Sequence, residues 1–270
     1  MTQAPHTGPS VPGEPFLLSE VTWKTARATD YQVAVLPWGA TEAHNFHLPY
    51  GTDNYESAYV ARESAQLAAQ AGARVIVLPE IPFGVNTGQL DIRLCINMNP
   101  STQAAVLTDV ARSLEMQGIK KLVVLNGHGG NDFRQMIREL QPTCGIFICT
   151  VNWWSCVDPK PYFDEPGDHG GELETSAMLH IRPDLVLPLS EAGEGRARQF
   201  KLTGFREGWA WAPREWSRVT EDTGVGNPRA GTAEKGKKFL DAVTEKIGGF
   251  LIELAGADLG DMYQLRTAEL

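Results

Sequence analysis

Residues 33–53 of this 270-residue chain read VAVLPWGATEAHNFHLPYGTD, an apolar run followed by a polar loop. A short aliphatic and β-branched run bounded by turn residues is typical of a buried parallel strand, which we place at residues 32–38. The loop that follows carries potential metal ligands and no Lys or Arg: Glu42, His44, His47 and Asp53. Carboxylates and imidazoles gathered without a counter-charge are what a divalent metal site needs.

Local geometry supports this interpretation of the loop. If the backbone stays extended across Glu42 and His44, their side chains leave on the same side and can reach one ion or one pair of ions. Asp53 has a second interpretation, because Asp53 and Glu56 match a capping box for the helix that follows. The two roles of Asp53 are compatible.

The rest of the chain alternates strand and helix patterns. Further strands are expected at residues 74–78, 121–125 and 145–151, and helices at 53–72, 101–118, 133–140 and 232–255. Another helix, opened by the motif at residues 168–176, is expected to end near His180. This alternation predicts βαβ units with right-handed crossovers. The predicted fold class is therefore α/β, a single domain over residues 15–270 with a mostly parallel central sheet flanked by helices. Residues 1–14, rich in Pro, Gly, Ser and Thr, are expected to form a disordered tail.

Two further polar motifs follow later strands. NGHGGN at residues 126–131 follows the third, and DHGGELETS at residues 168–176 opens a helix beyond the fourth. Ligands bind outside the carboxyl ends of the strands in open parallel sheets, so we expect these motifs to meet the first loop. NGHGGN alone could cradle a phosphate, but it lacks a Lys, and its His favours a metal. Helix-dipole preference explains Glu172 and Glu174, but not His169 or the glycines.

Composition excludes several classes of partner. The net charge of -9 argues against binding to nucleic acid or an anionic membrane. No apolar run approaches the roughly 18 to 20 residues that span a bilayer, and the N-terminus lacks a signal-peptide pattern. The cysteines, which form no C-x-x-C pair, are Cys95, Cys144, Cys149 and Cys156. We therefore expect a reduced, cytoplasmic setting and a small-molecule substrate.

The three motifs, in this order and spacing, resemble the creatininase (creatinine amidohydrolase) family. The resemblance runs from about Leu18 to Gly236 and includes GVG at residues 224–226 and EKG at 234–236. It implies a creatininase-like α/β hydrolase with two divalent metal ions. Zinc is the first expectation, with manganese or iron as alternatives. Family members form ring-like hexamers, so the resemblance also implies a homo-oligomer.

Residue roles follow from the resemblance alone. It implies that Asp53 bridges two metals, that Glu42 and His128 complete one metal site, and that His44 belongs to the other. Two cations sharing an anionic bridge would lower the pKa of a bound water and polarise a substrate carbonyl. His169 matches the histidine that carries the proton from the attacking water to the leaving nitrogen, a task suited to imidazole.

The chain departs from creatininase at two positions that affect the chemistry. Creatininase has a second-metal glutamate two residues after its loop histidine, and Gly130 stands there. Glu174 is the first candidate to replace it, and Glu172 is the second candidate and a candidate catalytic residue. Creatininase also has a tryptophan shortly before its proton-transferring histidine, where this chain has Glu165, so creatinine is not the expected substrate.

Other side chains keep more than one interpretation. His47 is expected to order the loop rather than bind metal. Arg93, in the divergent segment 90–97, is either a contact for an anionic or polyhydroxyl substrate or a surface contact. Four tryptophans either wall a pocket or lie in a subunit interface: Trp153, Trp154, Trp209 and Trp211.

The sequence thus predicts a metal-dependent hydrolase that opens a C–N amide bond in a small cyclic or formamide-like molecule. One alternative keeps the site and changes the bond to a C–C bond in a cyclic diketone such as a diketo-inositol. Another is a family member that binds a metal or ligand without catalysis, because the usual second-metal glutamate is missing.

Overall fold

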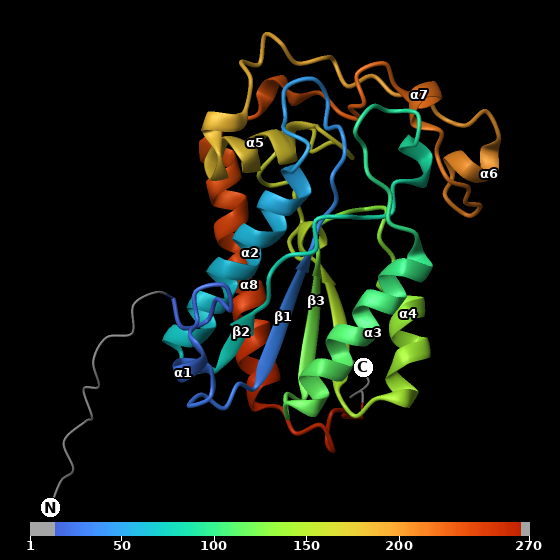
Figure 1. Ribbon diagram of the computed structural model, residues 1–270. Helices are drawn as coiled ribbons and strands as arrows, with labels where there is room; N and C mark the ends of the chain where they lie inside the picture. Colours follow the sequence, from blue (N-terminus) through green and yellow to red (C-terminus); the bar gives the residue numbers. More distant parts are fainter. Residues whose placement is uncertain (1–13, 266–270) are drawn as a thin grey trace, which may run out of the picture.

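The computed structural model describes residues 14–265 (Figure 1). The predicted tail at residues 1–14 lies outside this range except for Glu14, whose carboxylate accepts a hydrogen bond from Arg62 Nε at 2.9 Å. Residues 266–270 of the predicted domain also lie outside it.

Within the described residues the strands form one parallel four-stranded sheet in the order β2-β1-β3-β4. The strands are β1 (Val33–Trp38), β2 (Val75–Val77), β3 (Lys121–Asn126) and β4 (Phe147–Asn152). β1 pairs with β3 up to Trp38 and Asn126, so the polar loops after these two strands leave the sheet side by side. The predicted α/β fold is confirmed.

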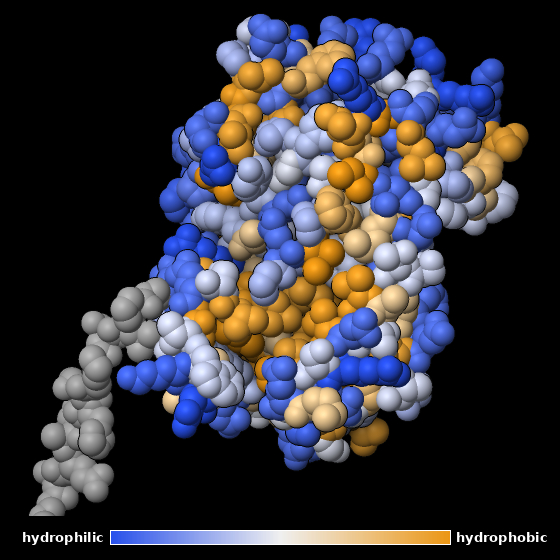
Figure 2. Space-filling view, in the orientation of Figure 1, coloured by the Kyte–Doolittle hydropathy of each residue, from blue (hydrophilic) through white to orange (hydrophobic). Residues whose placement is uncertain are grey.

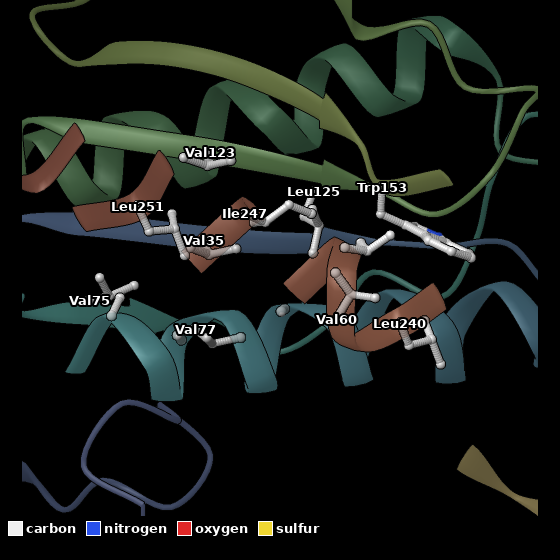
Figure 3. Close-up of a cluster of buried hydrophobic side chains, with 14 of the residues drawn as sticks. Val35, Val60, Val75, Val77, Val123, Leu125, Trp153, Leu240, Ile247 and Leu251 are labelled. Carbon is white, nitrogen blue, oxygen red and sulfur yellow. The ribbon is translucent and has the colours of Figure 1, made fainter. Parts of the chain in front are cut away.

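Helices cover both faces of the sheet (Figure 1). One layer contains α2 (Thr52–Gln70) and α8 (Ala233–Gly256), with α5 (Glu172–Ile181) packed against both. The other layer contains α3 (Pro100–Met116) and α4 (Phe133–Leu140). Alternate strand side chains point to opposite faces and fill two cores. Val35 and Leu125 meet α2 and α8 in one core (Figure 3), and Leu36 meets α3 in the other.

Several short elements were not predicted. They are α1 (Trp23–Ala26), α6 (Thr203–Arg206), α7 (Trp216–Val219), η1 (Thr87–Gln89), η2 (Gln141–Thr143), η3 (Trp153–Ser155), η4 (Pro183–Leu185) and η5 (Pro228–Ala230). Segments of three or four residues are too short to show a hydrophobic period, so sequence patterns do not reveal them.

The predicted capping box at the start of α2 was wrong. Gly51 is the N-cap, and no side chain caps the helix. Asp53 therefore lies inside the first turn, where its carboxylate is free to face the loops at the end of the sheet.

The long loops gather at the carboxyl end of the sheet. In Figure 1 the segments around η1, α6 and α7 lie at the top, beyond the strand ends. Val225 forms an antiparallel bridge with His169 and so holds the 168–176 motif beside the strand ends. None of the helices in residues 14–265 is long and apolar enough to cross a membrane.

Candidate metal centre

Six ionisable side chains converge at the carboxyl end of the sheet. They are Glu42 and His44 from the loop after β1, Asp53 from α2, His128 from the loop after β3, His169 before α5, and Glu174 within α5. Glu174 is partly exposed, and the other five are buried. The structure thus brings together all five predicted ligands and the predicted proton-transferring histidine.

The first group of potential ligands is Glu42, Asp53 and His128. His128 Nδ1 lies 2.9 Å from Glu42 Oε1 and 3.0 Å from Asp53 Oδ2. These contacts place one imidazole nitrogen between two carboxylates, an arrangement that can close around one divalent cation.

The second group is His44, Asp53 and Glu174. His44 Nε2 lies 2.8 Å from Asp53 Oδ1, whereas His128 faces Asp53 Oδ2. Asp53 therefore belongs to both groups and presents a different oxygen to each. A carboxylate placed in this way can bridge two cations.

Each histidine is oriented by a backbone carbonyl. One ring nitrogen of each residue donates to a carbonyl oxygen: His44 Nδ1 to Glu42 at 3.2 Å, His128 Nε2 to Val85 at 3.1 Å, and His169 Nε2 to Ala43 at 2.8 Å. A carbonyl only accepts, so these nitrogens carry the hydrogen and the opposite nitrogens face the carboxylates. Metal-binding histidines are held in this manner in proteins.

The electrostatics of the group favour a bound cation. Burial opposes a charge on His44, but the carboxylates of Asp53, Glu174 and Glu42 raise the pKa of His44 to about 10. Burial would raise the pKa of Asp53, but His44 and His128 hold it below its usual range. The negative potential of the carboxylates, which retains a proton on the His44 imidazole, would also attract a divalent cation. The mixed set of nitrogen and oxygen donors suits such an ion.

Glu56 is a further buried carboxyl group next to this cluster. It lies one turn along α2 from Asp53, and neither of its oxygens has a hydrogen-bond partner within the described residues. Burial, together with the negative charges of Glu174 and Asp53, raises the pKa of Glu56 well above its usual value. Burial and the neighbouring carboxylates therefore both favour the neutral form of the Glu56 carboxyl group.

Gln89 and Cys95 support Glu42 from the loop over the site. Gln89 Nε2 donates to Glu42 Oε2, and Gln89 Oε1 accepts from Cys95 Sγ at 3.1 Å. The backbone N–H of Ala43 donates to Cys95 Sγ at 3.3 Å. This network occupies Oε2 of Glu42 and leaves Oε1 to face the histidines. Sequence reasoning missed Gln89, because an isolated glutamine in a loop carries no pattern.

His169 faces the cluster through Nδ1, which lies 3.8 Å from Glu42 Oε1. Its ring packs against two others, with centroid distances of 4.1 Å to His44 and 4.7 Å to Trp216. Trp216 was not singled out in the sequence, although its ring packs on His169.

The structure explains why glycine stands at position 130. A Cβ atom at Gly130 would lie 2.3 Å from Val85 O and 2.4 Å from His128 Nε2. Because the Val85 oxygen belongs to the backbone, a glutamate at position 130 would displace the chain segment that holds His128. In the second group the carboxylate beside His44 and Asp53 is that of Glu174.

Glu172 lies outside the cluster. Its carboxylate is buried and pairs with Lys235 Nζ at 2.5 Å, and its other oxygen accepts from Glu165 N at 2.8 Å. Glu172 also does not line the cavity beside the cluster. This placement argues against the predicted catalytic or ligand role and favours a structural one, in which Glu172 ties α5 to α8.

Two other candidates also lie away from the cluster. His47 Nε2 is 2.8 Å from Thr175 Oγ1, which ties the first loop to α5 as expected for a residue that orders the loop. Arg93 is exposed and does not line the cavity, although its carbonyl accepts a hydrogen bond from the Tyr50 hydroxyl at 2.6 Å.

A cavity of about 190 Å³, which we call the inner cavity, reaches the cluster. A second cavity of about 760 Å³, the outer cavity, adjoins it. Trp153, Trp154 and Trp216 line the inner cavity. Trp211 lines only the outer one, and Trp209 lines neither and is 75% exposed. The four predicted tryptophans thus divide between the pocket and the surface.

Comparison with known proteins agrees with this architecture. Residues 19–251 match the family model "Creatininase: Creatinine amidohydrolase". A crystal structure from Bacteroides fragilis whose description names creatinine amidohydrolase has a TM-score of 0.87 and 43% identity, covering 92% of this chain and 99% of that chain.

Two curated relatives carry other names. The mycofactocin precursor peptide peptidase of Mycobacterium tuberculosis is 28% identical over 221 residues, which is 78% of this chain and 81% of the relative. The 3-dehydro-scyllo-inosose hydrolase of Thermotoga maritima is 25% identical over 174 residues, which is 59% of this chain and 53% of the relative.

Proposed function

The chain belongs to the creatininase family of hydrolases, and on this premise we propose that it opens a C–N amide bond with the help of two divalent metal ions. One observation carries the proposal. Asp53 is shared by two groups of ligands and presents Oδ1 to the side of His44 and Oδ2 to the side of His128. Such sharing is the geometry that a dinuclear centre requires.

In this proposal Glu42 and His128 hold one ion, His44 and Glu174 hold the other, and Asp53 holds both. Zinc is the first candidate, because imidazole and carboxylate ligands suit it, and manganese is the alternative. The pair of ions would supply a nucleophilic water near neutral pH and would polarise the substrate carbonyl.

His169 transfers the proton in this proposal. Its Nε2–H is committed to the Ala43 carbonyl, so Nδ1 is the atom that can accept a proton from the attacking water and return it to the leaving nitrogen. Packing against Trp216 and His44 restrains the ring and keeps Nδ1 directed at the cluster.

Two kinds of amide fit the site as substrates. The small inner cavity suits a cyclic or formamide-like molecule, whereas the adjoining outer cavity and the relative named as a peptidase favour a linear amide. A second candidate reaction is hydrolysis of a C–C bond in a cyclic diketone, which the relative named as an inosose hydrolase favours.

Turnover separates these reactions. Purified protein loaded with zinc or manganese should be incubated with cyclic amides, formamides, short peptides and cyclic diketones, with the products followed by mass spectrometry. We expect hydrolysis of at least one amide and loss of that activity in His169→Ala. Turnover of diketones alone would show that the bond cleaved is a C–C bond rather than the proposed C–N bond. No turnover by protein with two bound metals would favour the non-catalytic alternative.

A further inference from the structure

The inner and outer cavities share one stretch of wall. Five residues line both cavities: His128, Gly129, Gly130, Arg214 and Trp216. The inner cavity has room for a small group, and the outer one is about four times larger. A ligand that fills both would therefore be extended, with one part at the cluster and the rest beyond Arg214.

Arg214 is the one Lys or Arg among the described residues that line the two cavities. The wall of the inner cavity also carries four carboxylates and two histidines: Glu42, Asp53, Asp168, Glu174, His128 and His169. A guanidinium on the wall that the two cavities share, outside the group of potential metal ligands, is an attractive place for an anionic group of a ligand.

Aromatic packing fixes the position of this cation. The Arg214 guanidinium lies over the Trp216 ring, 4.5 Å from its centroid, and Trp216 packs on His169. Within the described residues its one side-chain hydrogen bond runs from Nη1 to Asp168 Oδ2 at 2.5 Å. A guanidinium has five N–H donors in a planar fork, so most of them stay available to a ligand.

We propose that Arg214 binds a carboxylate of the substrate, and that the substrate is therefore an extended amide bearing a carboxylate. The scissile carbonyl would lie in the inner cavity and the rest of the molecule in the outer one. The identity of the scissile bond rests on the proposed function, whereas carboxylate binding at Arg214 does not. A planar guanidinium recognises a carboxylate with two parallel hydrogen bonds, which a lysine cannot reproduce.

Binding can be measured without turnover. The probes are acetyl-glycyl-glycine, acetyl-glycyl-phenylalanine and the C-terminal amide of each, titrated calorimetrically into metal-loaded protein. We expect each acid to bind at least tenfold more tightly than its amide. Arg214→Met should remove this difference at unchanged metal content. Arg218→Met should preserve it, because Arg218 is exposed, pairs with Glu215 and lines neither cavity.

Asp168→Asn gives a test with the opposite sign. Because Asp168 competes for Arg214, its neutralisation should tighten acid binding several-fold. Weaker acid binding in this variant would instead make the pair a structural link and overturn the inference.

Two further results would also overturn it. One is an acid preference that persists in Arg214→Met, because the metals would then bind the carboxylate directly. The other is equal binding, or no binding, of acids and amides by the wild type. Arg214-dependent acid binding without cleavage of any amide would remove the proposed function and leave the carboxylate site standing.

Discussion

In the proposed centre Glu174 supplies the carboxylate that Gly130 cannot, and two nearby glutamates in α5, Glu172 and Glu174, can test this assignment. Glu174→Gln should reduce the bound metal from two ions per chain to one, because the amide is a weaker ligand than a carboxylate. Glu172→Gln should retain both ions but lower the free energy of unfolding by about 1–3 kcal/mol, because the buried bond to Lys235 loses its charge.

Metal content measured by plasma mass spectrometry on dialysed protein, together with urea unfolding, distinguishes the two variants. Loss of metal in Glu172→Gln with retention in Glu174→Gln would reverse the assignment of the second site.

In the proposed centre Gln89 supports metal binding through its hydrogen bond to Glu42. Gln89→Met should leave Glu42 Oε2 without its buried donor, and the metal affinity should fall by about 10–100-fold, as is typical when the partner of a ligand is removed. Competition with a fluorescent chelator measures this affinity directly. Gln135→Met is the matched control, because Gln135 is exposed on the wall of the outer cavity and makes no contact with Glu42. Equal affinity in the two variants would exclude a positioning role for Gln89.

Site residues could be predicted from the sequence where several of them lie close together in the chain. Glu42, His44 and Asp53 stand within twelve residues of one another in the sequence, and their lack of a counter-charge was enough to predict a metal site. Gln89, Arg214 and Trp216 meet the cluster only after the long loops fold back over the strand ends. No spacing links them to the ligands, so sequence patterns could not identify them.

Glycines in α8 show how closely this helix packs on α5. A Cβ at Gly236 would lie 1.9 Å from Ser176 O, whereas a Cβ at Gly249 meets nothing within 4 Å. Gly236→Ala should therefore destabilise the fold by about 1–3 kcal/mol or more through overpacking. Gly249→Ala should stabilise it by about 0.4–1 kcal/mol, because alanine restricts the unfolded chain and favours helix. Shifts of the urea midpoint in the same direction for both variants would contradict this account.

Elements were predictable where hydrophobic patterns were long enough. The buried run at β1 and the apolar face of α8 placed these elements within a residue or two of their observed bounds. The start of α2 was misjudged, because the match of Asp53 and Glu56 to a capping box ignored Gly51, which takes the N-cap. The contacts of the Asp53 carboxylate with His44 and His128 outweighed its local preference for capping the helix.

The surface of the whole molecule carries apolar groups at the end where the long loops lie. Leu90, Leu94, Trp209 and Trp211 are each at least 70% exposed. Figure 2 shows apolar residues interrupting the hydrophilic surface at the top, and a continuous apolar area in a hollow in front of the sheet. Large exposed apolar areas are typical of subunit interfaces. We therefore propose that the chain forms a homo-oligomer, and a hexamer is the form that the family resemblance implies.

Light scattering after gel filtration should then give a multiple of the mass of one chain. Leu90→Glu should shift this mass towards the monomer, because a buried interface does not accommodate an unpaired charge. Trp23→Glu serves as the control, because Trp23 is exposed on α1, away from the long loops. A monomeric wild type would contradict the proposal.

The metal centre joins segments from across the chain, so its occupancy should control the stability of the whole molecule. The ligands come from the loops after β1 and β3 and from α2 and α5, and most are buried carboxylates and imidazoles. Free metal at about a hundred times its dissociation constant stabilises the folded state by about 2.7 kcal/mol for each site. In a domain of this size that corresponds to an increase in Tm of roughly 5–10 °C per site.

Calorimetry with zinc, manganese or a chelator measures the effect. The increase in Tm should persist in Glu172→Gln and shrink in Glu174→Gln. A Tm that is unchanged by added metal and by chelator would show that the cluster binds no ion.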